Sequence, residues 1–226
     1  MGTRYEMKVR LVSYTTPVIE DLPKDSSILD LIAFCARVSN PSNQQNTETS
    51  EKLVQYLIKH KHFSPFEMAN VCLEIETTRD IARQILRHRS FTFQEFSQRY
   101  ADPVQELTFE TREARLQDTK NRQNSIVADD DMLQREWNAV QNTLINHAKE
   151  AYNWAIQKGV AKEVARAVLP EGLTMSRMYV NGTLRSWLHY IEIRSDEATQ
   201  KEHREIALAC ATAISKLFPL IDTFTQ

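Results

Sequence analysis

Arginine, glutamine and histidine gather in one short part of the chain, at residues 83–89. Arg83, Gln84 and Arg87 lie three and four positions apart, so they share one face of the helix that the apolar spacing predicts here. His88 and Arg89 follow as that helix ends. A guanidinium group is a planar fork of donors, which suits a phosphate or the carbonyl edge of a base. These residue types therefore point to an anion or nucleotide site.

A second polar pattern follows directly, with Glu95, Ser97 and Arg99 at alternate positions. Residues 94–100 are expected to be extended, and alternate side chains of an extended segment project to one side. An acceptor, a hydroxyl and a permanent cation on one edge suit a sugar, a base edge and a phosphate. On charge pattern alone, a solvated basic helix end with ordinary surface residues is the commoner explanation of such a cluster.

Glycine is scarce, and this excludes the usual ways of holding a nucleotide. The chain has four glycines, Gly2, Gly159, Gly172 and Gly182. They cannot form the glycine-rich phosphate loop of a dinucleotide fingerprint or of a Walker motif. Any bound nucleotide must therefore be held by side chains.

Charge and cysteine content narrow the class of protein further. The formal net charge of -2 gives no overall field that would attract nucleic acid or an acidic membrane. No apolar run approaches the length of a membrane span. Cys35, Cys72 and Cys210 are odd in number and lie in apolar runs, which favours reduced core thiols over a disulfide framework. We therefore expect a cytoplasmic protein.

The elements that must position the polar cluster form a single α+β domain over residues 1–226. More helix than sheet is expected, with a small and mostly antiparallel sheet. Strands are expected at residues 9–13 and within 66–77, the second half-exposed with Val71, Leu73 and Ile75 on one face and Glu74 and Glu76 on the other. Helices are expected to begin at Ser26 or Ser27, at Ser50 and at Thr78 or Arg79, and to cover 163–169, 183–193 and 198–217.

The clearest helix follows three consecutive aspartates at 129–131, whose acidic side chains suit a helix N-terminus. Its apolar residues recur at three or four positions until Gly159 ends it, and Trp137, Tyr152 and Trp154 are expected in the core. Residues 116–125 are polar and aperiodic, so a loop is expected there.

Four ordered segments carry a family resemblance. Arg87-His88-Arg89, seven further residues and then Ser97 resemble the signature of flavin-dependent thymidylate synthases, and Ser97-Gln98-Arg99-Tyr100 extends the match. The family's other segments are matched by His62-Phe63-Ser64-Pro65-Phe66-Glu67, by Ala165-Arg166-Ala167-Val168-Leu169-Pro170, and by Thr183-Leu184-Arg185-Ser186-Trp187 followed by His189 and Arg194. An ordered set across residues 62–194 is far more specific than one triplet.

The resemblance implies two binding sites, each built from more than one subunit of a homotetramer. It assigns FAD contacts to His62, Ser64, Arg87, His88, Arg89, Glu95, Thr183, Arg185 and His189. It assigns dUMP contacts to Gln84, Arg87, Glu95, Ser97, Gln98, Arg99, Arg166 and Arg194.

The resemblance also implies an activity, the reductive methylation of dUMP to dTMP by a methyltransferase that is a flavoprotein. The family takes the carbon from 5,10-methylenetetrahydrofolate and a hydride from FAD that NADPH has reduced. Arg99 and Arg166 would neutralise the 5′-phosphate. Arg194, the family's catalytic arginine, would stabilise negative charge at the uracil edge and favour ionisation at N3.

Two positions depart from the family pattern. Ala198 stands where the family often has a flavin-contacting histidine, and Thr183 stands where it often has asparagine. His203 or another group could compensate at the first position, and we assign His203 no role from sequence. Classical thymidylate synthases attack uracil with a cysteine that follows proline, and none of the three cysteines here does so. Ser97 has no neighbouring base in sequence, which favours binding over nucleophilic attack.

Three other interpretations carry less weight. His60 and His62, at i and i+2 without a third ligand, are a weak metal signal, so no metal is expected. A nucleic-acid-binding module is disfavoured by the net negative charge and the lack of a wider basic stripe. A helical protein without activity is disfavoured by the intact arginine, histidine and serine positions of the signature. Neither nucleic acid nor a membrane is therefore expected as a partner.

Overall fold

The computed structural model describes residues 8–225, and its centre is a four-stranded antiparallel sheet in the order β1-β2-β6-β3. The strands are β1 (Lys8–Tyr14), β2 (Asn70–Thr78), β6 (Met175–Thr183) and β3 (Thr92–Glu95). This confirms an α+β fold with a small antiparallel sheet. The strand β6 was not expected from the sequence, although it pairs with β2 along its whole length. Its apolar Met178 and Val180 alternate with the polar Arg177 and Asn181, a signal that could have revealed it.

The second strand is buried on both faces, so the prediction of a half-exposed strand is wrong. Val71, Leu73 and Ile75 lie in the core as expected, but Glu74 is also only 4% exposed. The reason is its neighbours in the ladder. Arg10 lies opposite Glu74 and its Nη2 is 2.6 Å from Oε1, while Arg177 lies opposite Glu76 and forms a 2.7 Å ion pair. Long cationic side chains thus cover this face.

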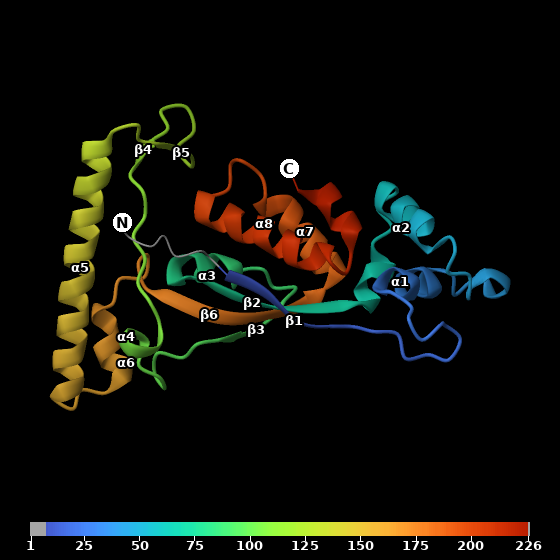
Figure 1. Ribbon diagram of the computed structural model, residues 1–226, viewed down its shortest axis with the longest axis horizontal. Coiled ribbons are helices and arrows are strands. Elements are labelled where there is room, and N and C mark those ends of the chain that lie inside the picture. The colour runs from blue at the N-terminus through green and yellow to red at the C-terminus, as the bar shows by residue number, and fades with distance from the viewer. Residues whose placement is uncertain (1–7, 226) are drawn as a thin grey trace.

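Helices cover the other face of the sheet. Figure 1 shows α3 (Arg79–Ile85), α7 (Leu184–Arg194) and α8 (Lys201–Ser215) on that face. The core between them and the sheet includes Trp187 and Tyr190, and the Trp187 indole donates to the carbonyl oxygen of Val71 over 2.9 Å. This packing fixes α7 against β2.

The remaining helices lie at the two ends of the sheet. In Figure 1, α1 (Ile28–Ala36) and α2 (Ser50–Lys59) lie at one end, and α5 (Asp131–Gln157) lies at the other, beside α4 (Pro103–Glu106) and α6 (Lys162–Ala165). Short 3₁₀ turns cover Pro41–Asn43 (η1), Ser64–Met68 (η2), Arg166–Val168 (η3) and Pro219–Phe224 (η4). None of the helices within residues 8–225 is both long enough and apolar enough to cross a membrane.

Helix ends agree with the predicted signals. Ser27 caps α1 in a capping box with Asp30, and Asp130 caps α5 through two backbone N–H groups. Gly159 ends α5 with a φ of 79°. Lys61 adopts a φ of 58° just after α2, which turns the chain toward His62.

Three local predictions are wrong. Residues 94–100 are extended only to the end of β3, because Tyr100 and Ala101 donate back to the Ser97 carbonyl over 3.0 Å and form a turn. The predicted loop at 116–125 overlaps a two-stranded ribbon of β4 (Arg115–Gln117) and β5 (Ser125–Val127). Tyr152 is buried, but Trp137 and Trp154 are 42% and 60% exposed and do not belong to the core.

The cysteines are free thiols, and only one of them is fully buried. Cys210 lies in the core, where burial raises the pKa of its thiol well above the usual range. Cys35 and Cys72 are partly exposed, so the expectation of core thiols holds fully for Cys210 alone.

Candidate active site

Helix α7 carries residues of each predicted group along its length. Arg185 lies in its first turn, His189 in its middle and Arg194 at its last position. Thr183 caps the helix, since its hydroxyl accepts from the backbone N–H of Ser186 over 3.2 Å. With a rise of about 1.5 Å per residue, Arg185 and Arg194 lie about 14 Å apart along the axis. One helix thus serves separate parts of the site.

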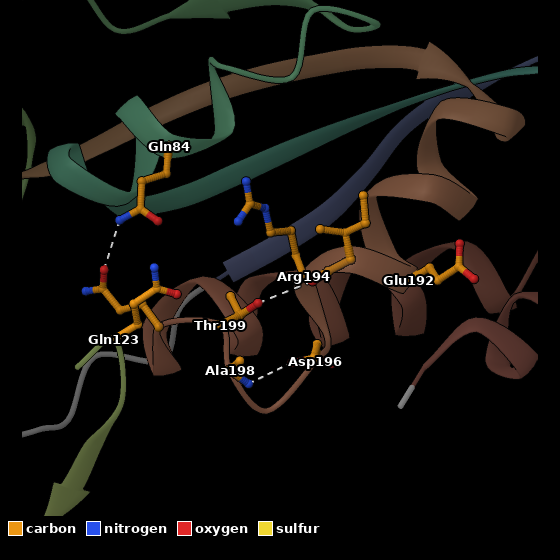
Figure 2. Close-up of a pocket in the computed structure, with 9 residues that line it drawn as sticks. Gln84, Gln123, Glu192, Arg194, Asp196, Ala198 and Thr199 are labelled. Carbon is orange, nitrogen blue, oxygen red and sulfur yellow. Dashed lines mark hydrogen bonds between the residues drawn. The ribbon is translucent and has the colours of Figure 1, made fainter. Parts of the chain in front are cut away.

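A cavity of about 680 Å³ opens between α3 and the end of α7. Figure 2 shows Gln84 reaching from α3 and the Arg194 guanidinium reaching toward α3, while Glu192 points away. Gln84 donates from Nε2 to the side-chain oxygen of Gln200 over 2.9 Å. The full lining is Gln84, Gln123, Glu192, Ile193, Arg194, Asp196, Ala198, Thr199 and Gln200.

The orientation of Arg194 is set by His88. The Arg194 Nε donates to His88 Nε2 over 3.0 Å, so that ring nitrogen carries no proton. Burial, with the nearby Arg194, His189 and Arg87, lowers the pKa of His88 from 6.5 to about 4. A neutral His88 is therefore the acceptor at ordinary pH. The sequence assigned His88 to the flavin and gave no sign of this contact.

The segment that carries Arg87, His88 and Arg89 is held down by Phe91. The Phe91 ring lies 4.6 Å from the Trp187 ring and 5.9 Å from Tyr190, measured between centroids. It sits directly over Gly182 of β6, where an added Cβ would come within 2.3 Å of the ring. Glycine is required at this position because the ring approaches the backbone so closely.

A second cavity, of about 420 Å³, contains two of the predicted nucleotide contacts. Ser97 and Arg99 line it with Tyr100, Ala161, Lys162 and Glu163. Arg99 Nε lies 3.5 Å from Glu163 Oε2, and these side chains are 67% and 56% exposed, so the pair is weak. Arg166 begins η3, three residues beyond Glu163. Lys162, whose Nζ donates to the Tyr100 carbonyl over 2.9 Å, was not singled out in the sequence.

Two predicted contacts are more enclosed than their assignments suggest. Gln98 is buried, and its Nε2 has no hydrogen-bond partner among residues 8–225. The Glu95 carboxylate is held by two contacts: its Oε1 accepts from the Ser176 hydroxyl over 2.8 Å and lies 3.5 Å from the Arg79 guanidinium. Arg79 and Ser176 were missed because a buried arginine and a strand serine carry no motif of their own.

A third group of predicted contacts lies where α7 begins. Arg185 forms an ion pair with Glu67 of η2, whose first residue is Ser64. His62, Ser64 and His189 are exposed, as are Arg87 and Arg89. These exposed imidazole and guanidinium donors fit a phosphate-bearing cofactor that is held by side chains. Within residues 8–225, no group of three or more histidine, cysteine or acidic side chains is arranged to hold a metal ion.

The structure thus brings the predicted residues together in separate groups. Gln84 and Arg194 line the first cavity, with His88 bonded to Arg194, and Ser97 and Arg99 line the second. The two cavities share no lining residue.

Comparison with known proteins identifies the chain's relatives. The family model described as thymidylate synthase complementing protein matches residues 21–220. A probable flavin-dependent thymidylate synthase of Paramecium bursaria Chlorella virus 1 is 48% identical over 217 residues, covering 95% of this chain and 97% of the relative. A flavin-dependent thymidylate synthase of Synechocystis is also 48% identical, over 215 residues with the same coverage.

A solved structure shares the fold. The crystal structure of the UMP/dUMP methylase PolB from Streptomyces cacaoi, bound with 5-Br dUMP, superposes with a TM-score of 0.80 at 24% identity. The match covers 98% of this chain and 95% of that chain. With the signature residues in place and the family model spanning most of the sequence, this chain belongs to the flavin-dependent thymidylate synthase family.

Proposed function

We propose that this chain is a methyltransferase that converts dUMP to dTMP with 5,10-methylenetetrahydrofolate as carbon donor and with FAD that NADPH reduces. The observation that carries the proposal is the first cavity, where a neutral His88 holds Arg194 opposite Gln84. A fixed cation beside a partly enclosed base stabilises negative charge at its edge, including charge left by loss of the N3 proton. Arg194 is therefore the proposed catalytic residue.

The second cavity is the proposed place for the 5′-phosphate. Arg99 is exposed and only weakly paired with Glu163, so its guanidinium can exchange that partner for a dianionic phosphate. Arg166 lies on the adjoining turn, and Ser97 lines the same cavity. Ser97 would then act by hydrogen bonding to the nucleotide.

FAD would be held by side chains along α7, η2 and the segment after α3. The residues are His62, Ser64, Arg87, His88, Arg89, Glu95, Thr183, Arg185 and His189, whose donors suit a diphosphate and a heterocycle. Bound FAD supplies the reducing equivalents of the reaction. The protein's own part is to place and orient the reactants, and to keep His88 neutral so that Arg194 stays aimed.

A homotetramer with shared sites is also part of the proposal. On α5, Met132, Trp137, Val140, Leu144 and Trp154 are exposed, and at 100° per residue they fall within an arc of about 140°. The buried Ile145, Ala148 and Tyr152 fall in the adjoining arc of about 60°. Because the apolar surface of α5 extends beyond the part that packs on this chain, its exposed part needs a second partner, and a second copy of this chain is the proposed one. Association of copies would also bring the first cavity of one chain close to the second cavity of another, and so join the nucleotide contacts that lie apart within one chain.

The proposal also covers the cellular compartment and the domain organisation. Cys35 and Cys72 are partly exposed thiols that form no disulfide, which supports a reducing compartment such as the cytoplasm. We propose one domain over residues 1–226.

Anaerobic turnover tests the activity. Purified protein is expected to be yellow and to form dTMP from dUMP, methylenetetrahydrofolate, FAD and NADPH. Arg194→Ala should keep its flavin but lose activity on the order of 100-fold or more, since it removes a fixed charge at the reacting base. Arg122→Ala, an exposed arginine in the turn between β4 and β5, is the matched control. A colourless protein that fails to take up FAD, or normal turnover by Arg194→Ala, would contradict the proposal.

A further inference from the structure

His203 is a fully buried histidine next to the first cavity, and no family segment includes it. It lies in the first turn of α8, facing α3 and α7. Its ring centroid is 5.7 Å from that of Tyr190 and 6.4 Å from that of His88. Its Nδ1 lies 3.2 Å from Oε1 of Gln84, the residue of α3 that lines the cavity.

A chain of hydrogen bonds fixes which atom donates at every step. Glu202 is an ion pair partner of Arg115 at 2.6 Å, so its carboxylate can only accept. Gln200 Nε2 donates to that carboxylate over 3.0 Å, which leaves the Gln200 oxygen facing Gln84. Gln84 must therefore offer Nε2 to Gln200, over 2.9 Å, and turn its own oxygen to His203. His203 Nδ1 consequently carries the proton.

The surroundings of His203 keep it neutral. Burial, together with the positive charge of Arg194 and the nearby His88, lowers its pKa from 6.5 to about 3. With the proton on Nδ1, the ring has one donor, and that donor is committed to Gln84. Its Nε2 is buried without a hydrogen-bond partner among residues 8–225, so nothing described there pulls the ring toward the other tautomer.

We propose that His203 is a positioning residue that locks the side-chain amide of Gln84 with its second N–H facing the cavity. Gln84 then offers a donor, and the group it selects is an oxygen acceptor on the bound nucleotide. If the amide were turned over, it would present an oxygen and repel the same group, so the lock contributes to specificity. This inference rests on the proposed function, in which Gln84 contacts dUMP.

Two isosteric variants separate donation at Nδ1 from mere filling of space. In His203→Asn the amide nitrogen comes close to the place of Nδ1, whereas in His203→Gln it comes closer to the place of Nε2. We would measure the Kd of dUMP by calorimetry on the oxidised FAD-loaded enzyme, with visible absorbance as the check on flavin content. His203→Gln should raise Kd about tenfold, the scale of one hydrogen bond to a ligand, and His203→Asn should stay within about threefold.

Gln84→Ala separates this inference from the proposed function. It should also raise Kd, and adding His203→Gln to it should bring no further loss, because the histidine acts through Gln84. Unchanged affinity in Gln84→Ala would overturn both the inference and the assignment of Gln84 to dUMP. Two outcomes would overturn the inference alone, provided that Gln84→Ala weakens dUMP binding. One is that His203→Asn and His203→Gln raise Kd equally, and the other is that the effects of Gln84→Ala and His203→Gln add in the double variant.

A spectroscopic measurement on the unaltered protein gives a second test that needs no variant. Solid-state NMR of ¹⁵N-histidine enzyme should show a neutral imidazole protonated at Nδ1 for His203, unchanged between pH 5 and pH 8. A ring protonated at Nε2, or a charged ring in that range, would overturn the inference.

Discussion

His88 shows how a single neutral residue can govern a charged one. An arginine at a helix end has many rotamers, and its charge is useful at a base edge only if it is held in one direction. The bond from Arg194 Nε to His88 Nε2 uses the inner donor of the guanidinium. The outer nitrogens are then free to face the cavity that Gln84 also lines. Because the acceptor is a neutral imidazole, it does not compensate the positive charge of Arg194, which stays available for the proposed contact with the base.

Arg99 gives a prediction about the phosphate. Arg99→Ala should weaken dUMP binding by about 2 kcal/mol, the scale of a charge-assisted hydrogen bond, as measured by calorimetry. Glu163→Gln is the informative companion, because the Arg99–Glu163 pair at 3.5 Å would compete with a phosphate bound at the proposed place. This variant should bind dUMP as tightly as the original chain or slightly more tightly. Equal weakening in both variants would mean that the ion pair, and not the phosphate, is what Arg99 serves.

At this scale the sequence predicted residue types well and their partners poorly. The motif led to Gln84, His88, Ser97, Arg99 and Arg194, and the structure places these at two cavities. The contacts of His88 and Glu95 could not be foreseen. They depend on which side chains β6 and α7 bring to the same place, and that is decided by packing over long sequence separations.

At the scale of elements, the close contact between β6 and the segment after α3 is decisive. Gly182→Ala should destabilise the fold by about 1–3 kcal/mol, because the new methyl group would overlap the Phe91 ring. Thermal unfolding measures this, and flavin content should fall with it as residues 87–89 are displaced. Gly172→Ala is the matched control, since its added Cβ would meet no atom closer than 3.9 Å. Comparable losses in both variants would contradict the role given to Phe91.

Elements with a local signal were predicted, and elements defined by their neighbours were not. The serine that caps α1 and the aspartate that caps α5 located these helices, because a cap is a contact within a few residues. The prediction of an extended segment at 94–100 was wrong beyond Glu95, where β3 ends before the turn that begins at Ser97. The burial of Glu74 was also missed, since it depends on Arg10, which is 64 residues away.

At the scale of the whole molecule, the exposed apolar part of α5 predicts assembly. Trp154→Glu places a charge on that face and should shift the protein from the proposed tetramer toward smaller species in sedimentation velocity, with dTMP formation falling in parallel. Asn153→Glu adds the same charge on the exposed polar side of the helix and should leave assembly intact. A chain that is monomeric before any substitution and still active would refute shared sites.

The pH dependence of the free energy of unfolding should report on Glu110. This residue lies in the segment before β4, where that segment packs on the rest of the fold. Burial raises the pKa of this carboxyl from 4.5 to about 7, opposed in part by Arg112. The folded protein thus favours the protonated form. This contribution to stability is complete below pH 4.5 and is lost as the pH rises through 7.

Glu110→Gln should therefore be more stable than the original chain at pH 8, and the difference should shrink toward pH 5. Chemical unfolding at several pH values measures it. Glu106→Gln, at an exposed position of α4, should show no such trend. A stability difference independent of pH would mean that Glu110 is charged throughout.

Helix α7 is one continuous helix that bears Arg185, His189 and Arg194. The hydrogen bond from its Trp187 indole to β2 fixes the helix against the sheet. A shift of the helix by a fraction of a turn would misplace all three side chains at once. Flavin bound at its proposed place near the first turn should therefore also fix the position of the last turn. We expect the protein without flavin to bind the nucleotide less tightly. Flavin would then bind before the nucleotide, and the rigidity of α7 would be the cause of that order.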